Sequence, residues 1–127
     1  MREWKKVKSR LKKDEESEYK LAVIEADDFF NEVLEKKGYT GEDFEEKINK
    51  LSDAEIPNIT ELKKAHQIRN SAVYDPDFTL ETEQARETMD TYEKALRSLG
   101  VIYWFYFKLL FVPLHFSQKK GGDDGRK

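Results

Sequence analysis

The stretch "SEYKLAVIEADDFFNEVLEKKG", residues 17–38, decides the fold. Its apolar residues recur at steps of three and four over several turns, which is typical of one broad helix face. These residues are Tyr19, Leu21, Ala22, Ile24, Ala26, Phe29, Phe30, Val33 and Leu34. Gly38 stands where a left-handed residue commonly ends a helix. We therefore predict a long core helix, and we interpret Glu25, Asp27 and Asp28 as part of its solvated face.

The segment before this helix reads "REWKKVKSRLKK", and it predicts a basic amphipathic helix over residues 1–13. Trp4, Val7 and Leu11 recur at helical steps, and Lys and Arg fill most of the other positions. Such a helix either lays its apolar stripe on the core or contacts lipid headgroups or RNA phosphates. No apolar stretch near Met1 resembles a signal peptide.

Three further helices are indicated downstream. A short one contains Phe44, Ile48 and Leu51, and we predict that Thr40 caps it. The next begins at Asn58, where the spacing to Glu61 matches a capping box. The apolar residues of this third helix are Leu62, Ala65, Ile68 and Ala72.

The last clear helix runs through "ETEQARETMDTYEKALRSLG", residues 81–100, and Gly100 is its expected stop. Its apolar stripe consists of Ala85, Met89, Tyr92, Leu96 and Leu99. No stretch between the helices alternates with the period of two that strands require. We therefore predict an all-α, four-to-five-helix bundle over residues 14–100.

The length and composition of the chain exclude several kinds of chemical site. With 127 residues the chain is one domain long, and a domain of that size buries about two thirds of its unfolded surface. The absence of cysteine excludes disulfides, thiolate metal sites and thiol nucleophiles. Two histidines in separate segments form no ligand pair, so we expect neither a metal nor a cofactor.

The motif "IRNSAVYDPDF", residues 68–78, ends the third helix with an Arg-Asn pair and an Asp-Pro turn. Together with the helical order, it resembles the HEPN superfamily of small α-bundles, and looks closest to an uncharacterised bacterial branch. The resemblance covers about residues 17–100. It implies a dimeric RNA binder or metal-independent endoribonuclease of a toxin or defence system. Arg69 and Asn70 match the first two motif positions, whereas Tyr74 holds the position of the family's histidine.

Metal-free RNA cleavage needs a base, an acid and a cation beside the reacting phosphate. Arg69 is suited to be that cation, and Asn70 to bind the substrate or fix Arg69. Tyr74 is a poor base, because a phenol with a reference pKa of about 10 is almost wholly protonated at neutral pH. His66, three residues before Arg69 on the same helix face, is a further candidate for the missing role.

Each of these residues also has a structural interpretation. Near the C-terminal end of the helix, Arg69 would interact favourably with the helix dipole and form an ion pair with Asp75 or Asp77. Asn70 would bond to the following turn, Tyr74 would be a half-buried edge aromatic, and His66 would be satisfied by local contacts at the edge of the bundle.

After Gly100 the sequence continues with "VIYWFYFKLLFVPLHF", residues 101–116, which is apolar and strongly aromatic. It is shorter than the roughly 20 residues that span a bilayer, and it contains Lys108 and Pro113. We predict an aromatic helix that covers the bundle or a partner, or that lies in the lipid headgroups. A spanning helix would need thinning of the bilayer. Residues 117–127 are expected to form a disordered polar tail.

Two function classes stay open. In the first, two protomers place Arg69, Asn70 and Tyr74 around a cleft, as a non-catalytic or degenerate HEPN-like RNA-binding module or a weak ribonuclease. In the second, the chain is a helical interaction protein anchored to a membrane surface or a partner through residues 1–13 and 101–116. We favour a non-catalytic, cytoplasmic HEPN-like module, with membrane association left open.

Overall fold

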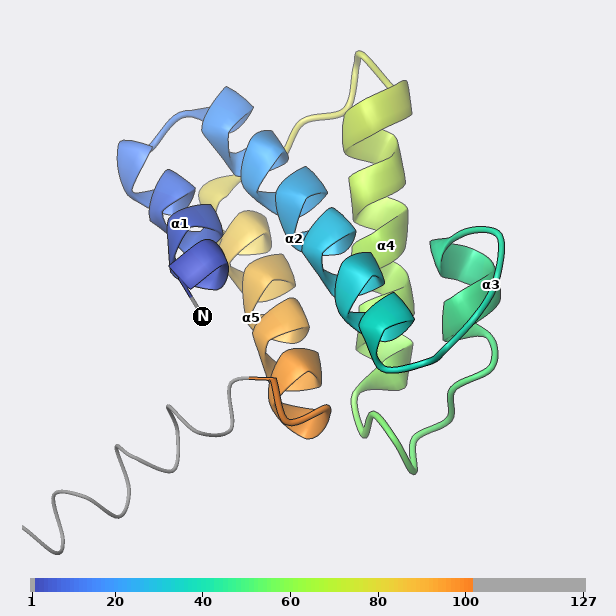
Figure 1. The fold of residues 1–127 in the computed structure, drawn as a ribbon. Coiled ribbons are helices and arrows are strands. Elements are labelled where there is room, and N and C mark those ends of the chain that lie inside the picture. The colour runs from blue at the N-terminus through green and yellow to red at the C-terminus, as the bar shows by residue number, and fades with distance from the viewer. Residues whose placement is uncertain (1, 102–127) are drawn as a thin grey trace, which may run out of the picture.

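The computed structural model describes residues 2–101, which contain helices and no strand (Figure 1). Helix α1 (Arg2–Ser9) and the 3-10 helix η1 (Arg10–Lys13) precede the long helix α2 (Glu16–Lys36). A short helix α3 (Phe44–Ile48) leads to α4 (Ile59–Tyr74) and then to α5 (Thr82–Ser98). The predicted all-α bundle is confirmed.

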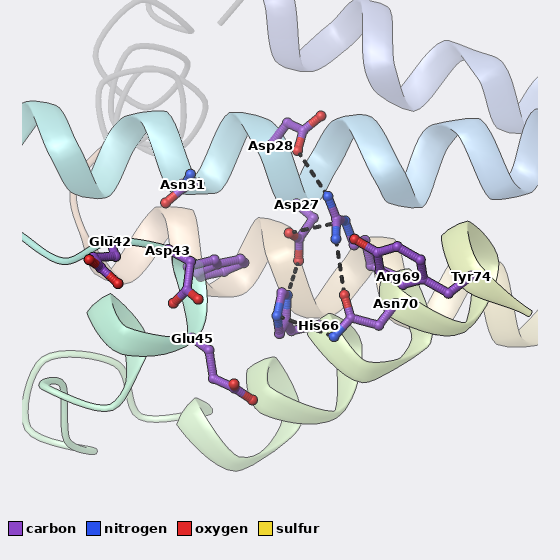
Figure 2. Close-up of a pocket in the computed structure, with 11 residues that line it drawn as sticks. Asp27, Asp28, Asn31, Glu42, Asp43, Glu45, His66, Arg69, Asn70 and Tyr74 are labelled. Atoms are coloured by element: carbon purple, nitrogen blue, oxygen red, sulfur yellow. Dashed lines mark hydrogen bonds and ion pairs between the residues drawn. The ribbon is translucent and has the colours of Figure 1, made fainter.

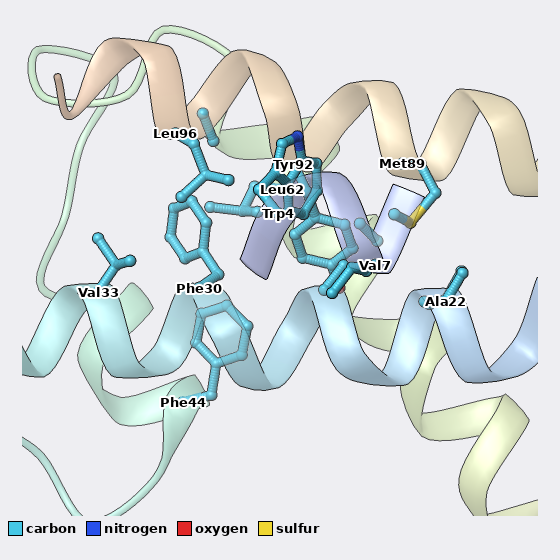
Figure 3. Packing of buried hydrophobic residues seen from close by; sticks show 14 of the residues in the cluster. Trp4, Val7, Ala22, Phe30, Val33, Phe44, Leu62, Met89, Tyr92 and Leu96 are labelled. Atoms are coloured by element: carbon cyan, nitrogen blue, oxygen red, sulfur yellow. The ribbon is translucent and has the colours of Figure 1, made fainter. Parts of the chain in front are cut away.

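Helix α2 is the centre of the bundle, because both α4 and α5 pack against it. Helix α4 runs in the opposite direction to its two long neighbours (Figure 1). Phe30 of α2 is fully buried between Tyr92 of α5 and Phe44 of α3, at ring-centroid distances of 6.3 Å and 5.8 Å (Figure 3). Burial of such large side chains is the main driving force for folding, at roughly 2–3 kcal/mol each. The stripe predicted for α2 is buried or partly buried except at Leu21, which is 40% exposed.

The apolar stripe of the N-terminal segment belongs to the same core. Trp4 is only 2% exposed, stacks on Phe29 at 6.0 Å and donates its indole N–H to Glu93 on α5 at 2.9 Å. The α-helical part is shorter than predicted, because it ends at Ser9 and tightens into η1. Asp14 then adopts a left-handed φ of 55° and turns the chain into α2.

The helix ends follow the sequence in part. Gly38 and Gly100 have φ values of 95° and 82°, so the predicted stops of α2 and α5 are confirmed. The predicted Thr40 cap is wrong: α3 starts after Asp43, whose carboxylate accepts from the backbone N–H of Glu46 at 2.9 Å. The capping box at Asn58 is also wrong, since its side chain does not cap α4 and its amide donates to the carbonyl of Thr91 on α5.

The predicted aromatic helix over residues 101–116 and the polar tail at 117–127 lie outside the described residues, apart from Val101. Val101 is partly buried against the core immediately after α5. Among the helices of residues 2–101, none combines the length and the apolar character that crossing a bilayer requires.

Candidate functional site

The residues singled out by the motif converge on one pocket. His66 at the middle of α4 and Arg69, Asn70 and Tyr74 in its C-terminal half line a hollow of about 410 Å³ between α2, α3 and α4 (Figure 2). Their spacing of three or four residues puts them on neighbouring turns of one helix face. The four side chains therefore line one pocket, and the binding role that the sequence suggests for them stays a prediction.

A buried aspartate organises the floor of this pocket. Asp27 of α2 is 2% exposed, and its Oδ2 lies 2.9 Å from Nδ1 of His66. The hydroxyl of Tyr92 on α5 donates to the same oxygen at 2.7 Å. Burial, together with the charge of Asp27, raises the pKa of Tyr92 well above its usual range, so Tyr92 stays a neutral hydrogen-bond donor.

Asp27 corrects the sequence interpretation, which placed it on a solvated face of the helix. Its position explains the burial, because it follows Val23 by four residues and precedes Phe30 by three, and both of these are fully buried. A carboxylate in the middle of an apolar stripe was the signal for a polar network. The sequence around Asp27 did not indicate that its hydrogen-bond partners would come from α4 and α5.

The motif arginine is paired inside the pocket. Its Nε lies 3.6 Å from Oδ1 of Asp27, and its Nη2 lies 3.7 Å from Oδ1 of Asp28. The predicted pairing with Asp75 or Asp77 is therefore wrong. The Asp75 carboxylate instead accepts from the backbone N–H of Asp77 and closes the turn after α4.

Asn70 links the arginine to the histidine. Its Oδ1 accepts from Nη1 of Arg69 at 3.0 Å, and its amide nitrogen lies 3.5 Å from Nε2 of His66. The predicted bond of Asn70 to the following turn is wrong. Nε of Arg69 is buried and has no hydrogen-bond partner within residues 2–101, because 3.6 Å to Asp27 is an ion-pair distance only.

The two remaining motif side chains differ in exposure. His66 is 9% exposed, and its ring meets Phe44 edge-on at 4.7 Å, so its contacts are mostly long-range and not those of a bundle edge. Tyr74 is 75% exposed, which contradicts the half-buried position predicted for it. Within residues 2–101 its hydroxyl makes no hydrogen bond.

The pocket is strongly acidic. Its charged lining consists of Arg69 and five carboxyl groups, those of Asp27, Asp28, Glu42, Asp43 and Glu45. Figure 2 shows the last three beside α3, at the opposite end from Arg69 and Tyr74. Burial raises the pKa of Asp28, and the charge of Arg69 opposes that rise. Across residues 2–101, no three His, Asp or Glu side chains are arranged to hold a metal ion.

Comparison with known proteins adds no relative: no family model, no curated protein and no solved structure matches the chain. The HEPN resemblance accordingly rests on the helical order and on the motif at residues 68–78.

Proposed function

We propose that the chain is a non-catalytic helical interaction module of the HEPN type, whose Arg69 pocket receives a basic side chain of a protein partner. One observation carries the proposal. The motif arginine is already paired with Asp27 and Asp28, in a pocket that holds five carboxyl groups. The homodimer and the toxin or defence setting implied by the resemblance stay predictions.

Charge argues against RNA in this pocket. Two unit charges about 4 Å apart interact by about 4 kcal/mol at an effective dielectric constant near 20. A phosphate beside Arg69 would gain one such attraction, and it would meet repulsion from Asp27 and Asp28, which lie within 3.7 Å of the same guanidinium. A polyanion therefore gains little there, whereas a lysine or arginine from a partner would be attracted by Glu42, Asp43 and Glu45 beside α3.

The first experiment measures RNA binding and cleavage together, with an end-labelled RNA pool in EDTA. Wild type, Arg69→Ala and Tyr74→His are compared. We expect no cleavage by any of the three proteins, and no loss of RNA binding in Arg69→Ala. Cleavage gained by Tyr74→His, together with weaker binding by Arg69→Ala, would instead identify a disabled RNA cleft.

The second experiment tests the basic partner directly, with a fluorescent oligolysine peptide as the probe. The pocket variant is Asp28→Asn, Glu42→Gln, Glu45→Gln. Asp43 is left intact because it caps α3. The matched control removes three exposed carboxylates on α4 and α5, through Glu61→Gln, Glu83→Gln and Glu87→Gln. We expect at least tenfold weaker binding in the pocket variant only; equal loss in both would show non-specific attraction and refute the pocket.

One observation favours a second candidate, a weak metal-independent endoribonuclease. Asp27 engages Nδ1 of His66, which leaves Nε2 directed toward Asn70 and the pocket, an arrangement typical of a general base. In this reading His66 supplies the imidazole that Tyr74 cannot. The RNA assay decides, because wild type would then cut, His66→Ala would not, and Tyr74→Phe would retain the activity.

A further inference from the structure

Three exposed apolar side chains lie at one end of the bundle. Across residues 2–101, the large apolar residues with exposed side chains are Leu21 of α2 and Val73 and Tyr74 of α4. Every other large apolar residue of this range is buried or partly buried. We call these three residues the apolar ridge.

The two helices carry the ridge away from one shared ion pair in the same direction. Oδ1 of Asp28 on α2 lies 3.7 Å from Nη2 of Arg69 on α4. Leu21 precedes Asp28 by seven residues, so it lies on the same stripe of α2, about 10 Å along the axis. Val73 follows Arg69 by four residues, about 6 Å along α4. Because α2 and α4 run in opposite directions, both steps lead to the same end of the bundle (Figure 1).

Negative charge surrounds the ridge. Asp75 and Asp77 are exposed in the turn that follows it, and Tyr74 itself lines the pocket with five carboxyl groups. Two cations next to the ridge, Arg69 and Lys20, are already engaged, the first by carboxylates of α2 and the second by a backbone carbonyl. An RNA phosphate or an anionic headgroup is therefore repelled here, whereas a cationic partner is attracted.

We propose that the apolar ridge docks a positively charged amphipathic helix of a partner protein. Residues 2–101 contain no strand, and therefore no open sheet edge with which an extended peptide could pair its backbone. A helix satisfies its own backbone and presents apolar side chains at steps of three and four. Those side chains would cover the ridge, while lysine or arginine on the same helix reaches the pocket. The inference rests on the proposed function, because the carboxyl groups of the pocket supply the attraction.

The test measures the binding of three fluorescent model peptides to the full chain by anisotropy. The first is an amphipathic helix of leucine and lysine, with the leucines at steps of three and four. The second has glutamine in place of leucine at the same charge, and the third has glutamate in place of lysine. We expect the first peptide to bind about tenfold tighter than the second, because apolar anchors at the centre of an interface contribute about that factor or more. The third should not bind.

The ridge variant carries Leu21→Ser and Val73→Ser, two exposed positions that do not line the pocket. The matched control carries Ile59→Ser and Leu99→Ser, two partly buried apolar residues at the other end of the bundle (Figure 1). Circular dichroism checks that both variants keep the helical content of wild type. We expect the ridge variant to bind the first peptide no tighter than the second, and the control to keep the preference of wild type.

Equal binding of the first two peptides by wild type, or equal loss in the two variants, would overturn the inference. If the second peptide still binds through the pocket, the proposed function stands without the ridge; if neither peptide binds, both fail. A wild-type dimer in sedimentation velocity that the ridge variant abolishes would assign the ridge to a second copy of the chain. Ridge-dependent binding of an RNA pool would assign it to nucleic acid, and either result would refute a helical partner.

Discussion

Replacement of Asp27 by alanine is the most informative perturbation of this fold, because one buried carboxylate satisfies donors from two other helices. The substitution leaves the hydroxyl of Tyr92, 0% exposed, without its acceptor at 2.7 Å, and His66 without its partner at 2.9 Å. It also removes a counter-charge 3.6 Å from Arg69. An unsatisfied buried donor costs about 1–3 kcal/mol, and breaking a buried charge pair costs about 3–5 kcal/mol. We expect Asp27→Ala to lower the free energy of unfolding by about 4 kcal/mol.

A double-mutant cycle with Tyr92→Phe separates the polar contribution from simple loss of packing. In the wild-type background, Tyr92→Phe removes one hydrogen bond and should cost about 1 kcal/mol. In the Asp27→Ala background the same change removes a stranded hydroxyl, so it should be neutral or stabilising. The expected coupling free energy is therefore 1 kcal/mol or more.

Urea unfolding followed by far-UV circular dichroism measures all four proteins, with the free energy extrapolated linearly to zero denaturant. A small domain has only about 5–15 kcal/mol of stability, so the change is large against the total. A cost below about 1 kcal/mol for Asp27→Ala, or an equal cost of Tyr92→Phe in both backgrounds, would refute the reasoning. Ser98→Ala, an exposed change at the end of α5, serves as the control.

Three other predictions follow from the packing and the charges. Burial acts to raise the pKa of Glu93, but hydrogen bonds from Lys8 and Trp4 outweigh it and hold that pKa below its ordinary value of 4.5. The ionised carboxylate of Glu93 therefore stabilises the folded state above pH 4.5, and this contribution is lost as the pH falls below 4.5 and the group is protonated. Glu93→Gln should accordingly flatten the pH dependence of the urea midpoint below pH 4.5. Phe30→Ala opens a cavity at the centre of the core and should lower the unfolding free energy by about 3–5 kcal/mol, measured by the same titration. Gly38→Ala should cost about 1 kcal/mol, because its φ of 95° strains any residue with a Cβ although no atom stands in the way; no change in the thermal midpoint would contradict this.

Much of the fold was predictable, because it depends on residues that are close together in the sequence. The apolar stripes of α2 and α5, and the glycines that end them, lie within a few residues of the structure they specify. Helix starts were predicted less well, because a capping side chain has several acceptors and donors in reach. Asn58 bonds to Thr91 on α5 instead of capping its own helix, a choice that only the neighbouring helix offers.

The sequence by itself determined that this chain folds into helices and which faces of the long helices are apolar. It also determined that His66, Arg69, Asn70 and Tyr74 share one side of α4. Both follow from helical periodicity, which relates residues three or four positions apart. Only the tertiary structure decided the character of the pocket. Asp27 meets His66 across 39 residues and Tyr92 across 65. The packing of α3 also brings the carboxylates of Glu42, Asp43 and Glu45 to the pocket that contains Arg69. Their combined negative potential makes this pocket acidic, although the Arg-Asn motif alone is suited to bind phosphate. No short stretch of the sequence indicates that potential.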